Sequence, residues 1–337
     1  LKKLRGRIIK FNPKLVNSNR YITLLGDGSL GGKGRGLAFL SNFIENVYLK
    51  KLIPNLRVAI PKTAVIGVDE FDNFLETNNL YDVIFEDKEY DHVLEAFRTA
   101  RLSEKLRDNL RKYLQVMTKP LAVRSSGLFE DSLNQPFAGV YSTYLLPNNH
   151  PDFERRLEDV ENAIKLVFAS IYSPESRAYF NAIDYMIEEE KMAVIIQEVI
   201  GNEHNGRYYP EISGVAQSYN FYPFSYIQPE DGFAVTAIGL GAYVVGGEKT
   251  HRFSPAYPKL QLASTQDKIK ASQRYFYGVN MLAQDYDLYR DGENAAIKAY
   301  DISEAERDGT LEYTASVYDF MNDQITYDFS VKGPRIV

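Results

Sequence analysis

The sequence has 337 residues, 45% of them hydrophobic and 25% charged, with 39 Lys and Arg, 45 Asp and Glu, and no Cys or Trp. This composition is typical of a globular protein of about two domains, or of one large α/β unit, and it excludes disordered and collagen-like chains. The lack of cysteine excludes a disulfide framework, a thiolate nucleophile, a zinc ribbon and an iron–sulfur cluster, and no apolar run nears the roughly 20 residues that cross a bilayer, so we expect a cytoplasmic protein without a membrane partner.

Residues 1–20 are predicted to form a basic leader or linker. They contain seven Lys and Arg residues and no acid, so the other 317 residues hold 32 basic and 45 acidic side chains, a net charge of −13. An acidic body disfavours a nucleic-acid partner. The leader could touch nucleic acid or an acidic partner, but Pro13 and three Asn residues favour a solvated linker. Because the chain begins at Leu1 and not at Met, we expect a piece of a longer protein.

Hydrophobic periodicity and turn residues predict helices and strands that alternate at irregular spacing. Residues 152–171 carry a single apolar stripe at helical spacing, and Ser173-Pro174-Glu175 supplies the N-cap, first-turn proline and first-turn acid of another helix. Beyond residue 260 the pattern weakens to helical stretches with many polar residues. The remaining expected elements are strands at 21–25, 58–60, 63–68, 121–123, 137–146, 192–200, 212–219 and 233–240, a helix after the glycines that end at 36, a helix capped by Asp69, and a helix over 103–116.

Several of these strands follow one another directly, which favours a mixed α+β or two-lobed α/β fold over a regular barrel. We expect a first lobe over residues 21–190, which contains a glycine-rich cluster and an arginine at a strand end. The second lobe, over residues 191–337, begins with a strongly β-prone strand, and we expect it to be truncated at its C-terminal end.

The glycine-rich cluster is the first candidate site. It reads Gly26-Asp-Gly-Ser-Leu-Gly-Gly-Lys-Gly-Arg-Gly36 between an expected strand and an expected helix. Successive glycines let backbone N–H groups converge on an anion, the start of a helix adds its positive dipole end, and Lys33 adds a point charge that could reach a terminal phosphate. Phosphate binding and a tight strand-to-helix turn both remain open for this cluster.

Two familiar phosphate-binding patterns do not fit the cluster. Gly26, Gly28 and Gly31 match G-x-G-x-x-G, but the acid that a dinucleotide fold needs about 20 residues later is missing. The P-loop pattern needs Gly at position 27 and Ser or Thr at 34, where Asp27 and Gly34 stand. A dinucleotide-dependent oxidoreductase therefore remains only a weak alternative.

The second candidate is the segment Val123-Arg-Ser-Ser-Gly-Leu-Phe-Glu-Asp131, in which Arg124 and two hydroxyl groups leave the end of a buried strand. Ligands of open α/β sheets bind at strand ends, and a guanidinium offers a bidentate fork to phosphate oxygens. The alternative is a local ion pair of Arg124 with Glu130 or Asp131.

The third candidate is the apolar strand Ala193-Val-Ile-Ile-Gln-Glu-Val-Ile200, with Gln197 and Glu198 in its middle. Such a strand can offer backbone N–H and C=O groups to the edge of an adenine while its apolar side chains stack on the ring. The simpler interpretation is an ordinary half-exposed strand.

Other patterns carry no function. The four histidines lie 58, 54 and 47 residues apart, so they form no local metal-ligand pair. No G-x-S-x-G nucleophile elbow is present. The aromatic residues between Tyr208 and Tyr226 lack the basic groove that base stacking on nucleic acid requires.

Taken in order, the three candidates resemble the N-terminal nucleotide-binding domain of the phosphoenolpyruvate synthase and pyruvate phosphate dikinase family, which has an ATP-grasp-type fold. The similar segments span residues 24 to 255. They are Gly31-Gly-Lys-Gly34 with Gly36-Leu37-Ala38 (family G-G-K-G-x-x-L), Val123-Arg-Ser-Ser126 with Glu130-Asp131 and Phe137-Ala-Gly139 (V-R-S-S…E-D…F-A-G), Gln197 to Ile200 with Ser213-Gly-Val215 (Q-x-M-V…S-G-V), and Gly239-Leu-Gly241 with Val244, Val245 and Gly247 (G-L-G-E-x-V-V-x-G).

The resemblance implies that Lys33 and Arg124 are catalytic residues on the ATP phosphates, and that Gln197 to Val199 line the adenine pocket. It implies ATP and Mg²⁺ as cofactors, and transfer of a phosphoryl group to a histidine on a separate domain and then to pyruvate or a similar acceptor on another. These two domains of a parent protein are the expected partners besides ATP. The ATP-binding residues implied are Gly31, Gly32, Lys33, Gly34, Arg124, Ser125, Ser126, Glu130, Asp131, Gln197, Glu198, Val199, Gly239 and Gly241.

The sequence also departs from the family. Ala242 stands where the family has the carboxylate of G-L-G-E, Ser254-Pro255 replaces P-D, and Ala216 begins a stretch unlike the family's F-T-x-D. The metal-binding block D-x-E…Q-x-R-P is not found before Val337, so the metal ligands are unknown and we expect them beyond that residue. We therefore expect a fragment that is inactive alone, and we keep a non-catalytic nucleotide-sensing module as the alternative.

Overall fold

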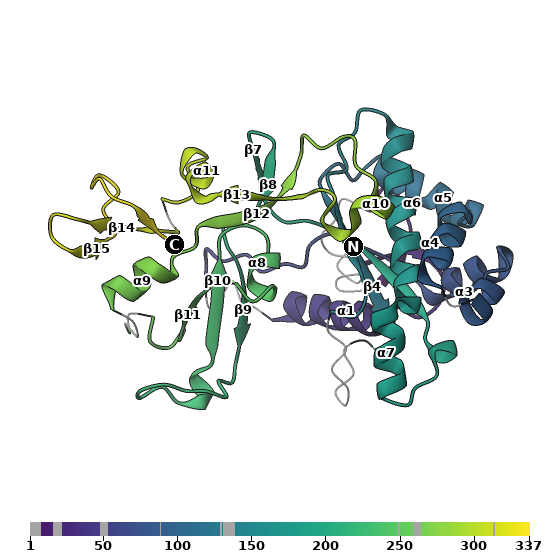
Figure 1. The fold of residues 1–337 in the computed structure, drawn as a ribbon, viewed down its shortest axis with the longest axis horizontal. Coiled ribbons are helices and arrows are strands. Elements are labelled where there is room, and N and C mark those ends of the chain that lie inside the picture. The colour runs from purple at the N-terminus through teal and green to yellow at the C-terminus, as the bar shows by residue number, and fades with distance from the viewer. Residues whose placement is uncertain are drawn as a thin grey trace. The chain divides into compact units, whose positions relative to one another are not determined.

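Two units, each with its own sheets, make up the chain in the computed structural model (Figure 1). The structure describes residues 8–15, 22–47, 53–87, 89–128, 130, 139–248, 250–258, 260, 264–312 and 314–337. The first unit comprises Leu1–Val199 and Ala283–Ala296, and the second comprises Ile200–Leu282 and Ile297–Val337. Helices and sheets occur in both units, which confirms the predicted α+β class.

The first unit is built on a six-stranded mixed sheet. Strands β2, β3 and β4 run in one direction, so their C-terminal ends lie at the same edge, while β6 runs antiparallel between β3 and β4. In spatial order the strands are β1 (Ile8–Lys10), β2 (Ile22–Gly26), β3 (Thr63–Ile66), β6 (Met192–Glu198), β4 (Leu121–Gly127) and β5 (Thr143–Leu146).

Helices cover both faces of this sheet. One face packs against α1 (Gly31–Asn46), where Leu30 and Leu37 contact Val65 and Ile195. The opposite face packs in the main core. The helices around that core are α3 (Val68–Thr77), α4 (Tyr90–Thr99), α5 (Glu104–Leu114), α6 (Phe153–Ala169), α7 (Pro174–Ala182) and α10 (Leu288–Asp291), with a π-helical turn at Val83–Asp87.

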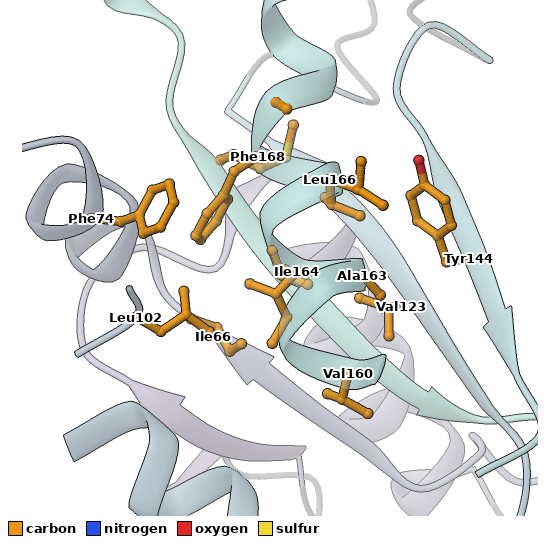
Figure 2. Packing of buried hydrophobic residues seen from close by; sticks show 14 of the residues in the cluster. Ile66, Phe74, Leu102, Val123, Tyr144, Val160, Ala163, Ile164, Leu166 and Phe168 are labelled. Carbon is orange, nitrogen blue, oxygen red and sulfur yellow. The ribbon is translucent and has the colours of Figure 1, made fainter. Parts of the chain in front are cut away.

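Helix α6 supplies the centre of the core, as its apolar stripe predicts. Figure 2 shows Ile164 and Phe168 pointing from α6 toward Phe74 and Ile66. The Phe168 ring lies 5.1 Å from the ring of Phe71 and 5.5 Å from that of Phe74, centroid to centroid. The N-caps Asp152 of α6 and Ser173 of α7 accept backbone N–H hydrogen bonds, which confirms both predicted helix starts.

The segment Ala283–Ala296 belongs to the first unit although its neighbours in sequence belong to the second. The Tyr286 hydroxyl donates to the Asp159 carboxylate over 2.8 Å, and Arg155 donates to the Tyr286 carbonyl over 2.9 Å. Both partners lie on α6, so the segment is fixed along that helix.

The second unit contains three small antiparallel sheets. Its core holds Tyr209, Ile238, Phe276, Ala305 and Leu311. The sheets are β9 (Ser213–Gln217), β10 (Phe233–Ala237) and β11 (His251–Phe253); β7 (Asn202–His204), β8 (Arg207–Tyr209), β12 (Tyr275–Asn280) and β13 (Ile297–Asp301); and β14 (Ser316–Asp319), β15 (Gln324–Thr326) and β16 (Arg335–Ile336), with helices α8 (Ala242–Val245), α9 (Thr265–Ala271) and α11 (Ile302–Arg307).

Several expected elements differ from the structure. Residues beyond 260 include five strands as well as helices, so the helical expectation there is wrong. No strand forms at 58–60, and Gly67, not Asp69, is the N-cap of α3. The expected lobe boundary between residues 190 and 191 differs from the observed division because β6 pairs on both sides within the first unit. None of the described helices is both long and apolar enough to cross a bilayer.

Candidate functional site

Helix α1 begins inside the glycine cluster and touches the end of β4. Its first residue, Gly31, has φ +68°, and a Cβ atom there would lie 1.8 Å from the carbonyl oxygen of Ser126. A Cβ on Gly32 would lie 1.7 Å from the carbonyl oxygen of Glu130. Only glycine permits this approach, so the cluster is a structural requirement of the strand–helix contact.

Ser126 joins the strand to the helix. Its buried Oγ atom accepts the backbone N–H of Gly34 over 2.9 Å and donates to the carbonyl of Leu30 over 2.7 Å. One hydroxyl therefore bonds to both backbone groups that close the first turn of α1, the N–H of Gly34 and the carbonyl of Leu30. This contact brings the first two candidate segments together, 92 residues apart in the sequence.

Lys33 lies in the first turn of α1 and reaches past the end of β4. Its ammonium donates to the Glu130 carboxylate and, over 3.2 Å, to the Ser125 hydroxyl. Glu130 also accepts the Ser125 hydroxyl and the Gly127 N–H, each over 3.0 Å. Glu130 is 3% exposed, whereas the Lys33 side chain is 25% exposed. The Lys33 ammonium is thus held by Glu130 and Ser125 and stays partly exposed to solvent.

Arg124 lies two residues before Ser126 and on the same face of β4, the face that α1 covers. It is half-buried, and its guanidinium donates to Gln197 Oε1 over 3.5 Å. Gln197 is itself held by a hydrogen bond from its amide nitrogen to Thr63 Oγ1, over 2.9 Å. Among the residues that the structure describes, no carboxylate pairs with Arg124.

Of the alternative local ion pairs of Arg124, the one with Glu130 is not formed, because Lys33 pairs with that carboxylate. Phe129 and Asp131 of the second candidate, and Phe137 and Ala138 of the similar segment that follows it, lie outside the described residues. Ser125 and Ser126 are fully buried, and their hydroxyls contact other residues of the site.

The third candidate strand is buried from Ala193 to Val199, whereas Ile200 at its end is exposed. Every residue of β6 is buried, so the expectation of a half-exposed strand is wrong; the strand is central in the sheet. The N–H groups of Glu198 and Val199 donate to the carbonyls of Lys62 and Pro120, each over 2.9 Å. The Glu198 carboxylate pairs with Lys119 and Lys62, at 2.9 and 3.8 Å. The backbone N–H groups of Glu198 and Val199 and the Glu198 carboxylate therefore all bind other residues of the first unit.

Gly239 and Gly241 lie in the second unit, between β10 and α8. Gly239 has φ +84°, and a Cβ atom there would lie 2.6 Å from the carbonyl oxygen of Tyr277. Gly241 is the N-cap residue of α8, which begins at Ala242. The Gly-Leu-Gly turn thus shapes this sheet-to-helix connection.

Sequence reasoning missed several residues that build the site. Gly127 packs between two carboxylates: its N–H binds Glu130, and a Cβ atom there would lie 2.3 Å from Glu190 Oε1. Burial, together with the negative charges of Glu190 and Glu130, raises the pKa of Tyr141, so its phenol stays neutral. The position of Gly127 directly after Arg-Ser-Ser could have identified it as part of the site. No sequence pattern pointed to Glu190 or Tyr141.

The described residues do not fit a resident metal ion. They contain no group of three or more His, Cys, Asp and Glu side chains that could hold one. Glu130 is committed to Lys33, Ser125 and Gly127. A magnesium ion at this site would therefore need ligands other than this carboxylate.

A groove of about 630 Å³ lies elsewhere in the first unit. Arg98, Arg107, Arg155 and Lys165 line it together with six acids, and most of these charges form ion pairs with one another. Lys33 and Arg124 do not line it. Strand β4 continues to Gly127, so the expectation that Arg124 leaves the end of the strand is wrong. The C-terminal half of β4 remains the candidate site because Arg124 there is half-buried and has no acid partner among the described residues.

Comparison with known proteins gives a family and several relatives. A family model for the AMP/ATP-binding domain of pyruvate phosphate dikinase matches residues 27–309. Phosphoenolpyruvate synthases of Aeropyrum pernix and Deinococcus radiodurans are 28% and 29% identical over 131 and 216 residues, or 39% and 62% of this chain. An uncharacterized phosphotransferase of Bacillus subtilis is 26% identical over 194 residues, or 57% of this chain. The matches cover 14%, 24% and 20% of these relatives, so the chain spans at most about a quarter of their length.

Proposed function

Because the chain belongs to the family of AMP/ATP-binding domains of pyruvate phosphate dikinase, we propose that it binds ATP at the edge of the sheet where β4 ends. Lys33 and Arg124 contact the phosphates in this proposal. The single observation that carries it is the half-buried guanidinium of Arg124, which lies in the middle of β4, three residues before Gly127 at its end, without an acid partner among the described residues. A bound anion would supply the counter-charge that the described residues do not give this half-buried cation.

Three features around Arg124 favour a phosphate ligand. Arginine binds phosphate oxygens through its planar fork, and Lys33 adds a second positive charge from the first turn of α1, next to Ser125 of the same strand. The first turn of α1 contains no acidic side chain, so its positive dipole end is not offset there. Gly31, Gly32 and Gly34 place that turn against β4.

We further propose that the nucleotide serves a phosphotransferase. ATP supplies the phosphoryl group, which passes to a histidine on another domain and then to pyruvate or a similar acceptor. The names of the relatives, phosphoenolpyruvate synthase and phosphotransferase, support this reaction class. Catalysis of this type rests on positioning and charge neutralisation, and these are what Lys33 and Arg124 offer. Mg²⁺ enters with the nucleotide phosphates in this proposal.

The second candidate function is a nucleotide-sensing module without catalysis. It is favoured by Ala242, which begins α8 where the resemblance implies a carboxylate. Labelled ATP incubated with the parent protein separates the two functions, because a labelled histidine forms only if phosphoryl transfer occurs.

Isothermal titration of the chain with ATP and MgCl₂ tests the binding proposal. Lys33→Ala and Arg124→Ala should each weaken binding about 10- to 100-fold, since a hydrogen bond to a charged group contributes about 1.5–3 kcal/mol. Asp159→Asn is the matched control, because Asp159 is a buried charged residue that pairs with Arg155 on α6. If both alanine variants bind ATP as the unaltered chain does, the proposal is overturned.

A further inference from the structure

The Glu130 carboxylate is the buried anchor of the Lys33 ammonium. We propose that Glu130 is a positioning residue that holds Lys33 in place for a nucleotide phosphate and acts on the nucleotide through Lys33 alone. This inference rests on the proposed ATP binding. It assigns Glu130 a different role from the direct ATP contact that the family resemblance implies.

Residues other than Lys33 also hold the Glu130 carboxylate in place. Its carboxylate accepts the backbone N–H of Gly127 and the hydroxyl of Ser125, both of which belong to the end of β4. A carboxylate held by two donors of a central sheet, and 3% exposed, has little freedom to turn. Lys33 therefore binds to a rigid acceptor.

Lys33 keeps one hydrogen for a ligand. An ammonium group has three N–H bonds, and Glu130 and Ser125 take two of them. In the described part of the chain no third acceptor binds the Lys33 ammonium, and its side chain is 25% exposed. A phosphate oxygen can thus approach the third hydrogen while the other two bonds persist.

The alternative role for Glu130 is a placeholder that gives up Lys33 when the nucleotide arrives. Burial argues against it. Of the described cations, Lys33 alone pairs with Glu130, so its departure would leave a buried carboxylate without a counter-charge. That state is strongly unfavourable, and the Lys33–Glu130 pair therefore persists in the complex. A lysine held in this way loses less side-chain freedom on binding than a free one.

The two roles predict opposite results for Glu130→Gln, which keeps the shape of the side chain and removes its charge. If Glu130 positions Lys33, Glu130→Gln should weaken the binding of ATP with MgCl₂ about tenfold in isothermal titration, because Lys33 is no longer held. A placeholder predicts tighter binding, because the competing anion is gone. Unchanged or tighter binding overturns the inference.

A double-mutant cycle separates positioning from a merely structural role. In a Lys33→Ala background, Glu130→Gln should change ATP affinity less than twofold, since its effect passes through Lys33. Loss of affinity by the full tenfold in that background overturns the inference. Asp159→Asn, another buried paired carboxylate of the same unit, should leave ATP affinity unchanged.

Failure of the inference and failure of the binding proposal are distinguishable. If Lys33→Ala weakens binding and Glu130→Gln does not, the inference alone fails. If neither Lys33→Ala nor Arg124→Ala weakens binding, the proposed site itself fails. If the Glu130→Gln variant does not fold, Ser125→Ala is tested in its place. Ser125→Ala removes one donor to Glu130 and one acceptor of Lys33. It should weaken ATP binding about threefold, and only in a chain that has Lys33.

Discussion

The side-chain oxygen of Ser126 lies 2.9 Å from the backbone nitrogen of Gly34, and this hydrogen bond ties β4 to the first turn of α1. The same hydroxyl donates to the Leu30 carbonyl, so a single buried atom serves two backbone groups at the start of the helix. The position of Lys33 depends on this bond, because Lys33 precedes Gly34 directly.

Ser126→Ala should therefore lower the free energy of unfolding by about 1–3 kcal/mol, the cost of leaving buried polar groups without partners. Urea unfolding followed by circular dichroism measures the change. Ser330→Ala is the control, since Ser330 is exposed and bonds only locally to Asp328; it should change stability by less than about 0.5 kcal/mol. Equal effects of the two substitutions would contradict the prediction.

Two glycines of α1 should respond in opposite directions to alanine. Gly31→Ala places a Cβ against the Ser126 carbonyl at a positive φ, and should destabilise the fold by more than about 2 kcal/mol. Gly36 has open space around the position of a Cβ and lies inside the same helix, so Gly36→Ala should stabilise it by about 0.5–1 kcal/mol. Urea unfolding of both variants measures the two changes in unfolding free energy. A Gly31→Ala variant that is more stable than the unaltered chain would refute the close contact of Gly31 with the Ser126 carbonyl.

Arg124→Lys should weaken ATP binding nearly as much as Arg124→Ala, although it keeps the positive charge. The planar fork of arginine is what matches two phosphate oxygens, and an ammonium group cannot reproduce it. Isothermal titration compares the two variants. Arg98→Lys is the control, because Arg98 is half exposed and pairs with Asp287 away from the site. Near-normal binding by Arg124→Lys would mean that charge alone matters.

The second unit should lose stability in acid through Asp308. Its fully buried side chain binds Arg207 and Tyr209. Burial acts to raise the pKa of Asp308, but the hydrogen bonds from Arg207, Tyr209 and Asn205 outweigh it and hold the pKa below its ordinary value of 3.8. A carboxyl group whose pKa is lower in the folded state stabilises the fold above its unfolded pKa and loses that effect as the pH falls through its folded pKa.

Asp308→Asn should accordingly cost about 3 kcal/mol of unfolding free energy at pH 7, and this deficit should shrink below about pH 4. Urea unfolding of both proteins at pH 7, 5, 4 and 3 tests the sign. A deficit that stays constant down to pH 3 would assign the loss to packing and not to the charge of Asp308.

Removal of the Phe168 ring should destabilise the first unit strongly. The ring is fully buried between Phe71 and Phe74, so Phe168→Ala should cost about 3–5 kcal/mol through lost burial and the cavity left behind. Phe43→Ala, at an exposed position of α1, should cost much less. Thermal unfolding ranks the two, and a reversed order would place the core elsewhere.

The sequence predicted those elements whose local pattern agrees with their environment. The stripe along α6 and the Ser173-Pro174-Glu175 start of α7 are both confirmed because burial of one face and capping are local properties. The start of α1 was missed: glycines disfavour a helix, and only contact with Ser126 and Glu130 explains why the helix begins at Gly31. Tertiary contact thus overrode local propensity.

The strands of the second unit beyond residue 260 were missed for a related reason, whereas β9 and β10 were predicted. Strand β12 reads Tyr-Phe-Tyr-Gly-Val-Asn, with β-prone aromatics, but the polar residues around it masked this signal. At the site, the sequence pointed to Lys33 in the glycine cluster and to Arg124 and Glu130 in a separate segment. Which cation takes the Glu130 carboxylate depends on the contact of α1 with the end of β4, since Lys33 and Glu130 are 97 positions apart, and no local pattern contains that information.

The return of Ala283–Ala296 to the first unit has a consequence for synthesis on the ribosome. The nascent chain cannot complete that unit when residue 199 emerges, because the segment that binds α6 through Tyr286 is made only after Ile200–Leu282. The surface of α6 around Asp159 lacks its partner Tyr286 until the ribosome has translated Ile200–Leu282, which is most of the second unit. Assembly of the first unit is therefore timed by translation of the second.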